Sequence, residues 1–273
     1  MIYLIDGIPT VGKSTLINSI IESDTVHVFR EQEYGNPLDI SRISIFTQEE
    51  FDIFYSSVKR VFREVYSDDY EEKIEIFDKS IERNRKWIFV HLNMLPFSNL
   101  KVCGVLTELM KFIPRNRFGN CQAYADFLID IWKNFLGNIK GDEEFWFECV
   151  AFQSILYDLI GHYDINDDTL IDIYIPLINL WKSHCVKLIV MEVDDISESF
   201  IKAARERCHG TPTWEEGFLS WIEGSVYGQR YKLQGREGGV AFLNRMMDAE
   251  NLILGLMPKS LYERKKRRIN NNA

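Results

Sequence analysis

The chain lacks the features that define several common classes of protein. Its 273 residues include five cysteines, an odd number that forms no C-x-x-C pair, which argues against a disulfide framework or a cysteine zinc site. The five histidines are scattered without metal-ligand spacing. No apolar run reaches the roughly 18 residues that span a membrane. These absences predict a cytoplasmic protein with reduced thiols and no membrane partner.

The chain also has fewer basic residues, 32, than acidic residues, 41. The net charge is −9, so we expect no general nucleic-acid partner, although a local basic groove stays open. The length and the hydrophobic content of 46% suffice for one large α/β core with a helical subdomain. The apolar start, Met1–Ile5, leads straight into a glycine-containing loop, so it is interpreted as a strand rather than a signal peptide.

That loop carries the most specific pattern in the chain. It fits G-x-x-x-x-G-K-[ST], in which glycines bring backbone N–H groups up to a triphosphate. Lys13 can then reach the β- and γ-phosphates, and the Ser14 hydroxyl can hold Mg²⁺. A strand before the loop and a helix over Leu16–Ile21 complete the expected P-loop context, which argues against a chance match. The predicted nucleotide-binding residues are Gly7, Pro9, Thr10, Val11, Gly12, Lys13, Ser14 and Thr15.

A second strand, Val26–Phe29, is followed by two acidic residues, Glu31 and Glu33. Because the carboxyl ends of parallel strands face the ligand crevice, either carboxylate can receive the proton of an acceptor hydroxyl. The pattern does not choose between them, and a charged loop without a catalytic role is the alternative.

Residues 39–140 form a block that is too long for a simple connection. Helical spacing of apolar residues after a capping box at Thr47–Glu50 predicts a mostly helical insert over the acceptor site. A turn in this insert carries Arg115 and Arg117. They are candidates for binding an anionic substrate, with a solvated basic turn as the alternative.

An apolar strand over Glu143–Phe147 ends in Glu148. A carboxylate there is a candidate Mg²⁺ ligand together with Ser14, and bonding to the substrate or to the arginines of a lid is the alternative. An unpaired buried charge is costly, so a purely structural role is the weaker interpretation. Gln153 follows at a helix start, where it can bond a polar substrate such as a nucleobase or simply cap the helix.

The last third of the chain places a strong strand, Val186–Val193, before a helix that carries Arg205 and Arg207. This order matches the lid of small kinases, in which arginines stabilise the charge of the transferring phosphoryl group. The lid would cover about residues 202–235, and a solvated helix end is the alternative. Residues 258–273 contain the basic run Arg264–Arg268 and are predicted to be a mobile tail.

Taken together, Asp6–Thr15 and the order of strand and lid resemble the P-loop kinases of the thymidylate-kinase and deoxynucleoside-kinase group. The stretches Phe147–Gln153 and Arg205–Gly228 are similar to bacterial kinase-like P-loop proteins. The resemblance implies an α/β P-loop NTPase fold, three-layer α/β/α with a parallel sheet, a helical insert and a helical lid. The core would comprise residues 1–38 and 141–257. The implied ligands are ATP and Mg²⁺.

The leading hypothesis is therefore a kinase that phosphorylates a small acceptor. Lys13, Glu31 or Glu33, Arg205 and Arg207 would be catalytic, and Ser14 and Glu148 would hold the metal. Glu148-Cys149 stands where related kinases carry D-R-[FYHS], so a nucleoside, a nucleotide and an antibiotic all stay open as acceptors. The alternatives are an ATPase or switch with a protein partner and, given the basic run, a nucleic-acid end kinase. The absence of N-K-x-D argues against a GTPase. The oligomeric state is open, including a homodimer.

Overall fold

The computed structural model describes residues 1–31, 33, 35–83, 86–95, 104–139, 141, 143–210 and 212–266. The chain divides into two compact units. The first combines Met1–Glu31 with Asn120–Ala273, and the second is Gln32–Gly119. The insert is therefore shorter than the predicted 39–140, because the helix α7 (Cys121–Asn138) belongs to the first unit.

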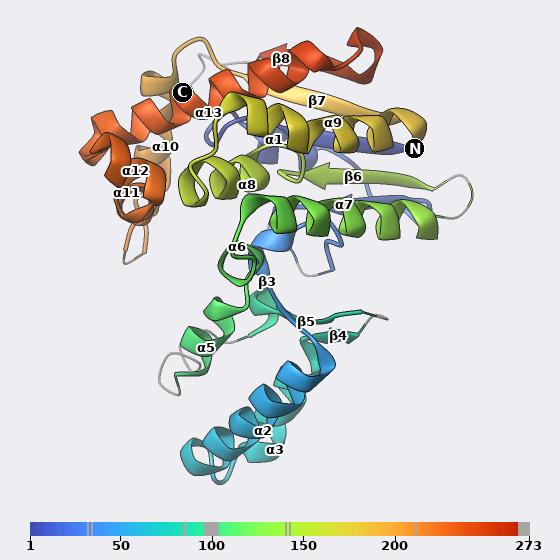
Figure 1. The fold of residues 1–273 in the computed structure, drawn as a ribbon, viewed down its shortest axis with the longest axis vertical. Helices are drawn as coiled ribbons and strands as arrows, with labels where there is room; N and C mark the ends of the chain where they lie inside the picture. The colour runs from blue at the N-terminus through green and yellow to red at the C-terminus, as the bar shows by residue number, and fades with distance from the viewer. Residues whose placement is uncertain are drawn as a thin grey trace. The chain divides into compact units, whose positions relative to one another are not determined.

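The first unit is built on a five-stranded sheet in the order β2-β6-β1-β7-β8 (Figure 1). All four strand pairs are parallel, which confirms the predicted parallel α/β sheet. The strands are β1 (Ile2–Asp6), β2 (Val26–Phe29), β6 (Glu144–Glu148), β7 (Val186–Glu192) and β8 (Tyr262–Lys266). In the centre, Leu4 stands opposite Phe147 on one side and Leu188 on the other, so apolar runs form the buried middle of the sheet.

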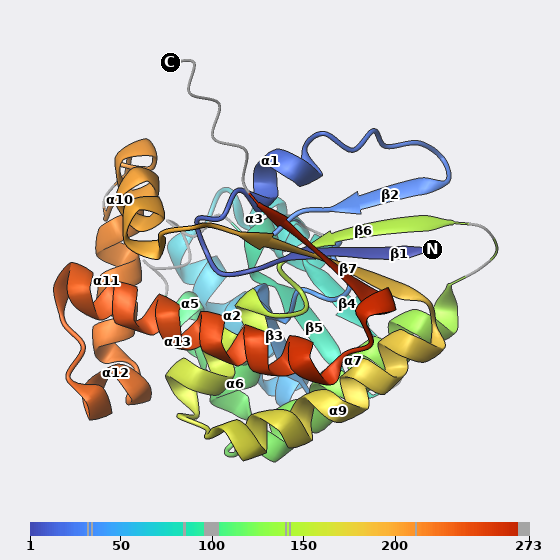
Figure 2. The same ribbon diagram turned by 90° about the horizontal axis from the view of Figure 1, so that it is seen from above.

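Helices cover both faces of this sheet, an arrangement compatible with a three-layer α/β/α fold. Figure 2 shows α7, α9 (Asp167–Ser183) and α13 (Gly235–Leu256) on one face and the short α1 (Lys13–Ile17) on the other. The remaining segments are α8 (Gln153–Leu156), a π-helical turn η3 (Tyr157–His162), α10 (Ile196–Glu206), α11 (Trp214–Gly224), α12 (Val226–Tyr231) and the 3₁₀ turn η4 (Lys259–Leu261). The fully buried Trp132 and Trp181 meet edge to face and join α7 to α9.

Two local predictions for this unit are wrong. The first helix ends at Ile17 rather than continuing to Ile21, and the Ser19 hydroxyl bonds the Leu16 carbonyl at 2.6 Å. The predicted mobile tail contains β8, whose basic residues meet acidic partners at the sheet edge. Arg264 pairs with Glu192, and Lys266 with Asp194. Residues 267–273, including the end of the basic run, lie outside the described residues.

The second unit is a small α+β structure rather than the mostly helical block that the spacing predicts. A three-stranded antiparallel sheet, in the order β3-β5-β4, consists of β3 (Ile43–Phe46), β5 (Ile88–His91) and β4 (Ile81–Arg83). All four residues of β3 and of β5 are buried. The helical segments are α2 (Gln48–Val65), α3 (Tyr70–Lys79), α5 (Val105–Lys111) and α6 (Pro114–Arg117), with the 3₁₀ turns η1 (Ile40–Arg42) and η2 (Leu92–Met94). An aromatic cluster that includes Phe46, Phe54 and Phe77 forms the core of this unit.

Gly228 in α12 gives a direct test of the packing in the predicted lid region. A Cβ at this position would lie 1.8 Å from the backbone carbonyl oxygen of Ile222, which cannot rotate away. We expect Gly228→Ala to lower the free energy of unfolding by roughly 2 to 4 kcal/mol, measured by urea denaturation. The matched control is Gly217→Ala in α11. A Cβ there meets nothing within 4 Å, so this variant should be neutral or slightly stabilised. Equal stabilities for the two variants would contradict the packing at α12.

Within the described residues, none of the helices combines the length and the apolar character needed to cross a bilayer.

Candidate functional site

The site begins at Asp6, the last residue of β1, which is completely buried. Its carboxylate accepts four backbone N–H groups: that of Gly7 at 2.9 Å and those of Ala151, Phe152 and Gln153 at 2.7, 2.9 and 3.0 Å. Burial raises the pKa of Asp6, and the Lys13 charge and the N–H groups of Gln153, Phe152 and Gly7 oppose the rise. Asp6 thus joins the loop after β1 to the loop after β6, which brings the ends of two neighbouring strands together.

The Gly7–Thr15 loop has the tight backbone that its glycines predict. Gly7 and Gly12 have φ values of 131° and 93°, and a Cβ at Gly7 would lie 2.5 Å from the Met191 carbonyl oxygen. Thr10 has a φ of 80°, which is strained for a threonine. Ser199 of α10 holds it there: the two hydroxyls are 3.0 Å apart, and the Ser199 hydroxyl donates to the Thr10 carbonyl at 3.1 Å. The helix of the predicted lid is therefore bonded directly to the loop.

The residues of the Gly7–Thr15 loop differ in how exposed they are to solvent. Gly7, Pro9, Thr10 and Val11 are buried, whereas Ser14 and Thr15 are exposed. One edge of the loop is consequently open to a ligand.

Lys13 stands at the start of α1 with only 5% of its surface exposed. Its ammonium donates to the carbonyl oxygens of Gly7 and Ile8 at 2.9 and 2.8 Å and to Oε1 of Gln153 at 2.7 Å. A buried ammonium with three acceptors satisfies its hydrogen-bonding capacity, which offsets the cost of burying the charge.

Ser14 and Glu148 lie together, as the hypothesis of a metal site requires. The Ser14 hydroxyl donates to Oε1 of Glu148 at 2.6 Å, and the backbone N–H of Glu31 donates to Oε2 at 3.2 Å. Glu148 ends β6 and is buried, so the parallel sheet places its carboxylate beside the loop after β1. A hydroxyl and a carboxylate are oxygen ligands of the kind that Mg²⁺ prefers.

The Glu31 side chain lies in the same cluster. Its Oε1 accepts from Nε2 of Gln153 at 2.7 Å, and its Oε2 accepts from the Cys149 thiol at 3.5 Å. Ligand atoms of Glu31, Glu148 and Cys149 all lie within 4.8 Å of one another. Burial raises the pKa of the Cys149 thiol well above its usual value, and Glu31 adds to the rise, so the thiol stays neutral and the carboxylates are the better ligands for a hard cation.

The sequence prediction left the choice between Glu31 and Glu33 open. The structure brings Glu31 into contact with Glu148 and Gln153, whereas Glu33 is exposed and belongs to the second unit. Arg115 and Arg117 also belong to the second unit. Arg117 pairs with Glu50 at 2.9 Å and lies over the rings of Trp87 and Phe112, so these contacts in its own unit account for its position.

The two predicted lid arginines lie at the end of α10. Arg205 is in its last turn and Arg207 is the C-cap residue, and both are exposed. Arg207 lies over the Trp214 ring, 5.2 Å from its centroid. Burial raises the pKa of Tyr157 in η3 well above its usual value, and Glu31 and Cys149 add to the rise. The positive charge of Arg207 acts in the opposite direction and lowers the pKa of Tyr157. Tyr157 therefore lies within the electrostatic influence of both Glu31 and Arg207.

Four residues at or near this loop were not predicted as site residues: Asp6, Cys149, Tyr157 and Ser199. Gln153 was considered only as a substrate ligand or a cap, whereas here it bonds Lys13 and Glu31. Asp6 precedes Gly7 and Cys149 follows Glu148, and both of these neighbours were predicted as site residues. The position of Asp6 and Cys149 at the ends of strands could therefore have indicated them from the sequence. Tyr157 and Ser199 come from distant segments, and only the tertiary fold reveals them.

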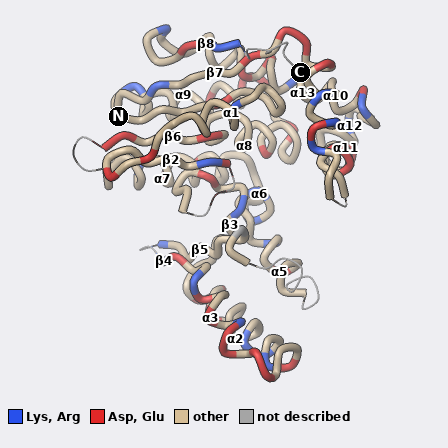
Figure 3. Tube along the Cα trace, turned by 180° about the vertical axis from the view of Figure 1, so that it is seen from behind, with Lys and Arg blue, Asp and Glu red and all other residues tan. Residues whose placement is uncertain are grey.

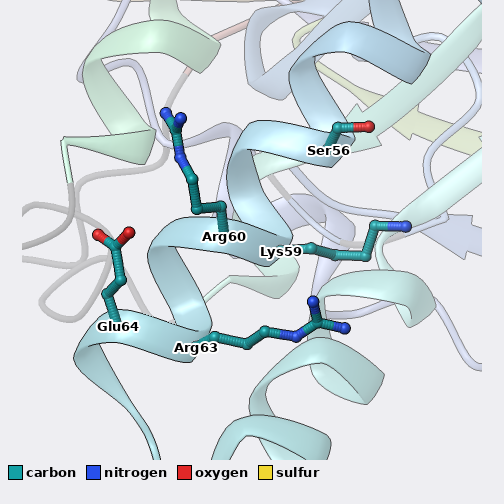
Figure 4. A pocket seen from close by; sticks show the side chains of 5 residues that line it. All are labelled: Ser56, Lys59, Arg60, Arg63 and Glu64. Carbon is teal, nitrogen blue, oxygen red and sulfur yellow. The ribbon is translucent and has the colours of Figure 1, made fainter.

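A surface pocket of about 430 Å³ lies elsewhere, on α2 in the second unit. Its lining residues all come from this one helix: Ser56, Lys59, Arg60, Arg63 and Glu64. Figure 4 shows Lys59 and Arg63 pointing to one side of the helix and Arg60 and Glu64 to the other, so their charges do not converge. Basic and acidic residues are interspersed along the described trace of both units (Figure 3). We assign no chemistry to this pocket.

Searches of protein-family models, curated proteins and solved structures found nothing that matches this chain. The function proposed below is therefore based on the side chains around the Gly7–Thr15 loop.

Glu250, on the inner side of α13, is a buried acid close to this cluster. It is 4% exposed, and its Oε2 has no hydrogen-bond partner in the described part of the chain. Burial raises its pKa from 4.5 to about 8; Asp6 adds to the rise, and Lys13 opposes it. The folded state thus favours the protonated acid.

The raised pKa of Glu250 predicts that the free energy of unfolding depends on pH. Between pH 4.5 and about 8 the unfolded state loses its proton first, so the wild-type protein should lose stability as the pH rises through this window. The loss should reach roughly 3 to 5 kcal/mol above pH 8, because each pKa unit corresponds to about 1.4 kcal/mol. Urea denaturation from pH 4 to 9 should show that Glu250→Gln removes much of this loss, whereas Glu237→Gln, at an exposed site on α13, does not. Parallel pH curves for wild type and Glu250→Gln would contradict the assignment.

Proposed function

We propose that this protein is an ATP-dependent kinase that transfers the γ-phosphoryl group to a hydroxyl or phosphate of a small acceptor. The observation that carries the proposal is a single hydrogen-bonded cluster of Lys13, Ser14, Glu31 and Glu148, in which Gln153 links Lys13 to Glu31. It lies at the carboxyl ends of β1, β2 and β6, where open parallel sheets bind their ligands.

The residues present fit ATP and Mg²⁺. Lys13 and the backbone N–H groups of the Gly7–Thr15 loop would hold the phosphates, and Ser14 with Glu148 would hold the cation. When bound, Mg²⁺ would neutralise charge on the phosphate oxygens. Thr15 and the buried residues Pro9, Thr10 and Val11 would shape the loop. Charge neutralisation and positioning are the main requirements of phosphoryl transfer, so no covalent intermediate with the protein is needed.

Glu31 would act at the acceptor. Its carboxylate would take the proton of an acceptor hydroxyl while the oxygen of that hydroxyl bonds to the γ-phosphorus. The bond from this phosphorus to the β,γ-bridging oxygen breaks, and ADP leaves with the bond's electron pair. Arg205 and Arg207 would come close to the phosphoryl group from the end of α10 and stabilise its charge. ATP and reduced thiols are both abundant in the cytoplasm, where we infer that the protein works.

The test is a substrate panel. Wild-type protein is incubated with ATP, Mg²⁺ and nucleosides, nucleotides or hydroxyl-bearing antibiotics, and the products are identified by mass spectrometry. A phosphorylated small molecule that forms only with Mg²⁺ supports the kinase. Free phosphate alone, stimulated by a protein partner, would show instead an ATPase or switch. Phosphorylation of oligonucleotide ends would show an end kinase.

A further inference from the structure

The Gln153 side chain connects the two halves of the cluster. Its Oε1 accepts from the Lys13 ammonium, and its Nε2 donates to Oε1 of Glu31, both at 2.7 Å. The side chain is 6% exposed, and each end of its amide is bonded to a charged group. An asparagine is one methylene shorter, so its amide would lie closer to the backbone than the Gln153 amide does. One amide therefore fixes the separation of the cation and the carboxylate.

The Lys13 ammonium is fully occupied in this arrangement. Its three protons are directed at three acceptors, two of which are carbonyl oxygens of the loop itself. A phosphate oxygen can bond the ammonium only if one acceptor gives way. Gln153 is the only side chain among the three, and its amide can rotate without moving the loop backbone.

We propose that Gln153 is a positioning residue that releases the Lys13 ammonium to a phosphate when the donor binds and thereby couples the donor site to the Glu31 carboxylate. This inference rests on the proposed kinase function. In the structure the amide holds Glu31 through the charge-assisted bond from Nε2. When Lys13 turns to the phosphate, Oε1 loses its donor, while Nε2 keeps Glu31 directed toward the acceptor.

The backbone at Gln153 is held independently of its side chain. Its N–H donates to Asp6 at 3.0 Å, and this bond survives any substitution except proline. The charged and titratable groups that face Glu31 are Glu148 on β6, Cys149 after β6 and Tyr157 on η3, and Lys13 on α1 lies at the other end of the Gln153 amide. Gln153→Ala removes none of these groups and keeps the backbone bond to Asp6, so it tests the contribution of the amide.

The experiment combines calorimetric Mg-ATP binding with steady-state kinetics for four proteins: wild type, Gln153→Ala, Gln153→Glu and the exposed control Gln122→Ala on α7. Gln153→Ala should lower kcat by about tenfold or more without weakening ATP binding. Gln153→Glu should weaken ATP binding by about tenfold or more, because a carboxylate holds the ammonium more strongly than an amide. Gln122→Ala should match wild type.

A double-mutant cycle separates positioning from a general structural role. In a Glu31→Gln background, Gln153→Ala should cause little further loss of kcat, because its partner is already inactive. Additive losses, or wild-type kcat in Gln153→Ala, would overturn the inference while leaving the kinase in place. Absence of both ATP binding and product in wild type would overturn the kinase itself, and the inference with it.

Discussion

Lys13→Ala should reduce phosphoryl transfer by at least about a thousandfold. The ammonium is the one buried cation in contact with the Gly7–Thr15 loop among the described residues, and it is placed beside both loop carbonyls and Gln153. Without it, negative charge that develops on the phosphate oxygens has no nearby lysine to stabilise it. Steady-state kinetics with the acceptor found in the substrate panel measures the loss.

The loss of phosphoryl transfer is informative only if the Lys13→Ala protein keeps its fold. We expect an unchanged far-UV circular dichroism spectrum, since the loop is also held through Asp6 and through the bonds between Thr10 and Ser199. The matched control is Lys182→Ala at an exposed site on α9, which should keep wild-type activity. Full activity of a folded Lys13→Ala protein would refute the phosphate assignment of the loop.

Glu31→Gln should lower kcat by roughly a hundredfold to ten-thousandfold, the range that a general base contributes. The substitution keeps the size of the side chain but removes its ability to take a proton. Mg-ATP affinity should change little, because Lys13, Ser14 and Glu148 keep their positions. Comparing kcat with the dissociation constant for ATP therefore separates loss of the base from loss of the donor site.

Glu33→Gln decides between the two acidic residues that follow β2. Glu31 contacts Glu148, Gln153 and Cys149, so we expect the large effect at Glu31 and little change at Glu33. A large loss of kcat in Glu33→Gln with an active Glu31→Gln protein would reverse the assignment.

Much of the first unit follows from local sequence. Four of its five strands were predicted within about a residue because each contains a short, mostly apolar run of strand length. Glu148 could be placed beside Ser14 from the rule that parallel strands end at one edge of the sheet. What these strand ends bind is still a prediction.

The remaining features depend on partners that are distant in sequence. β8 is rich in basic residues and has little apolar pattern, and its parallel pairing with β7 brings Arg264 and Lys266 to acidic residues some 70 positions earlier. Arg117 resembles a ligand-binding arginine until Glu50 and Trp87 are seen beside it. Gln153 is equally ambiguous, because a lone glutamine at a helix start does not reveal that a lysine and a glutamate lie at its two ends.

Binding of Mg-ATP to the wild-type protein and to Lys13→Ala, measured by isothermal titration calorimetry, tests the central claim most directly. It needs no knowledge of the acceptor. The proposed function predicts one molecule bound per wild-type chain, weaker binding when Mg²⁺ is removed, and a large loss of affinity in the folded Lys13→Ala protein. No binding to wild type, or equal affinity for the two proteins, would contradict the assignment of the Gly7–Thr15 loop as the site of the phosphoryl donor.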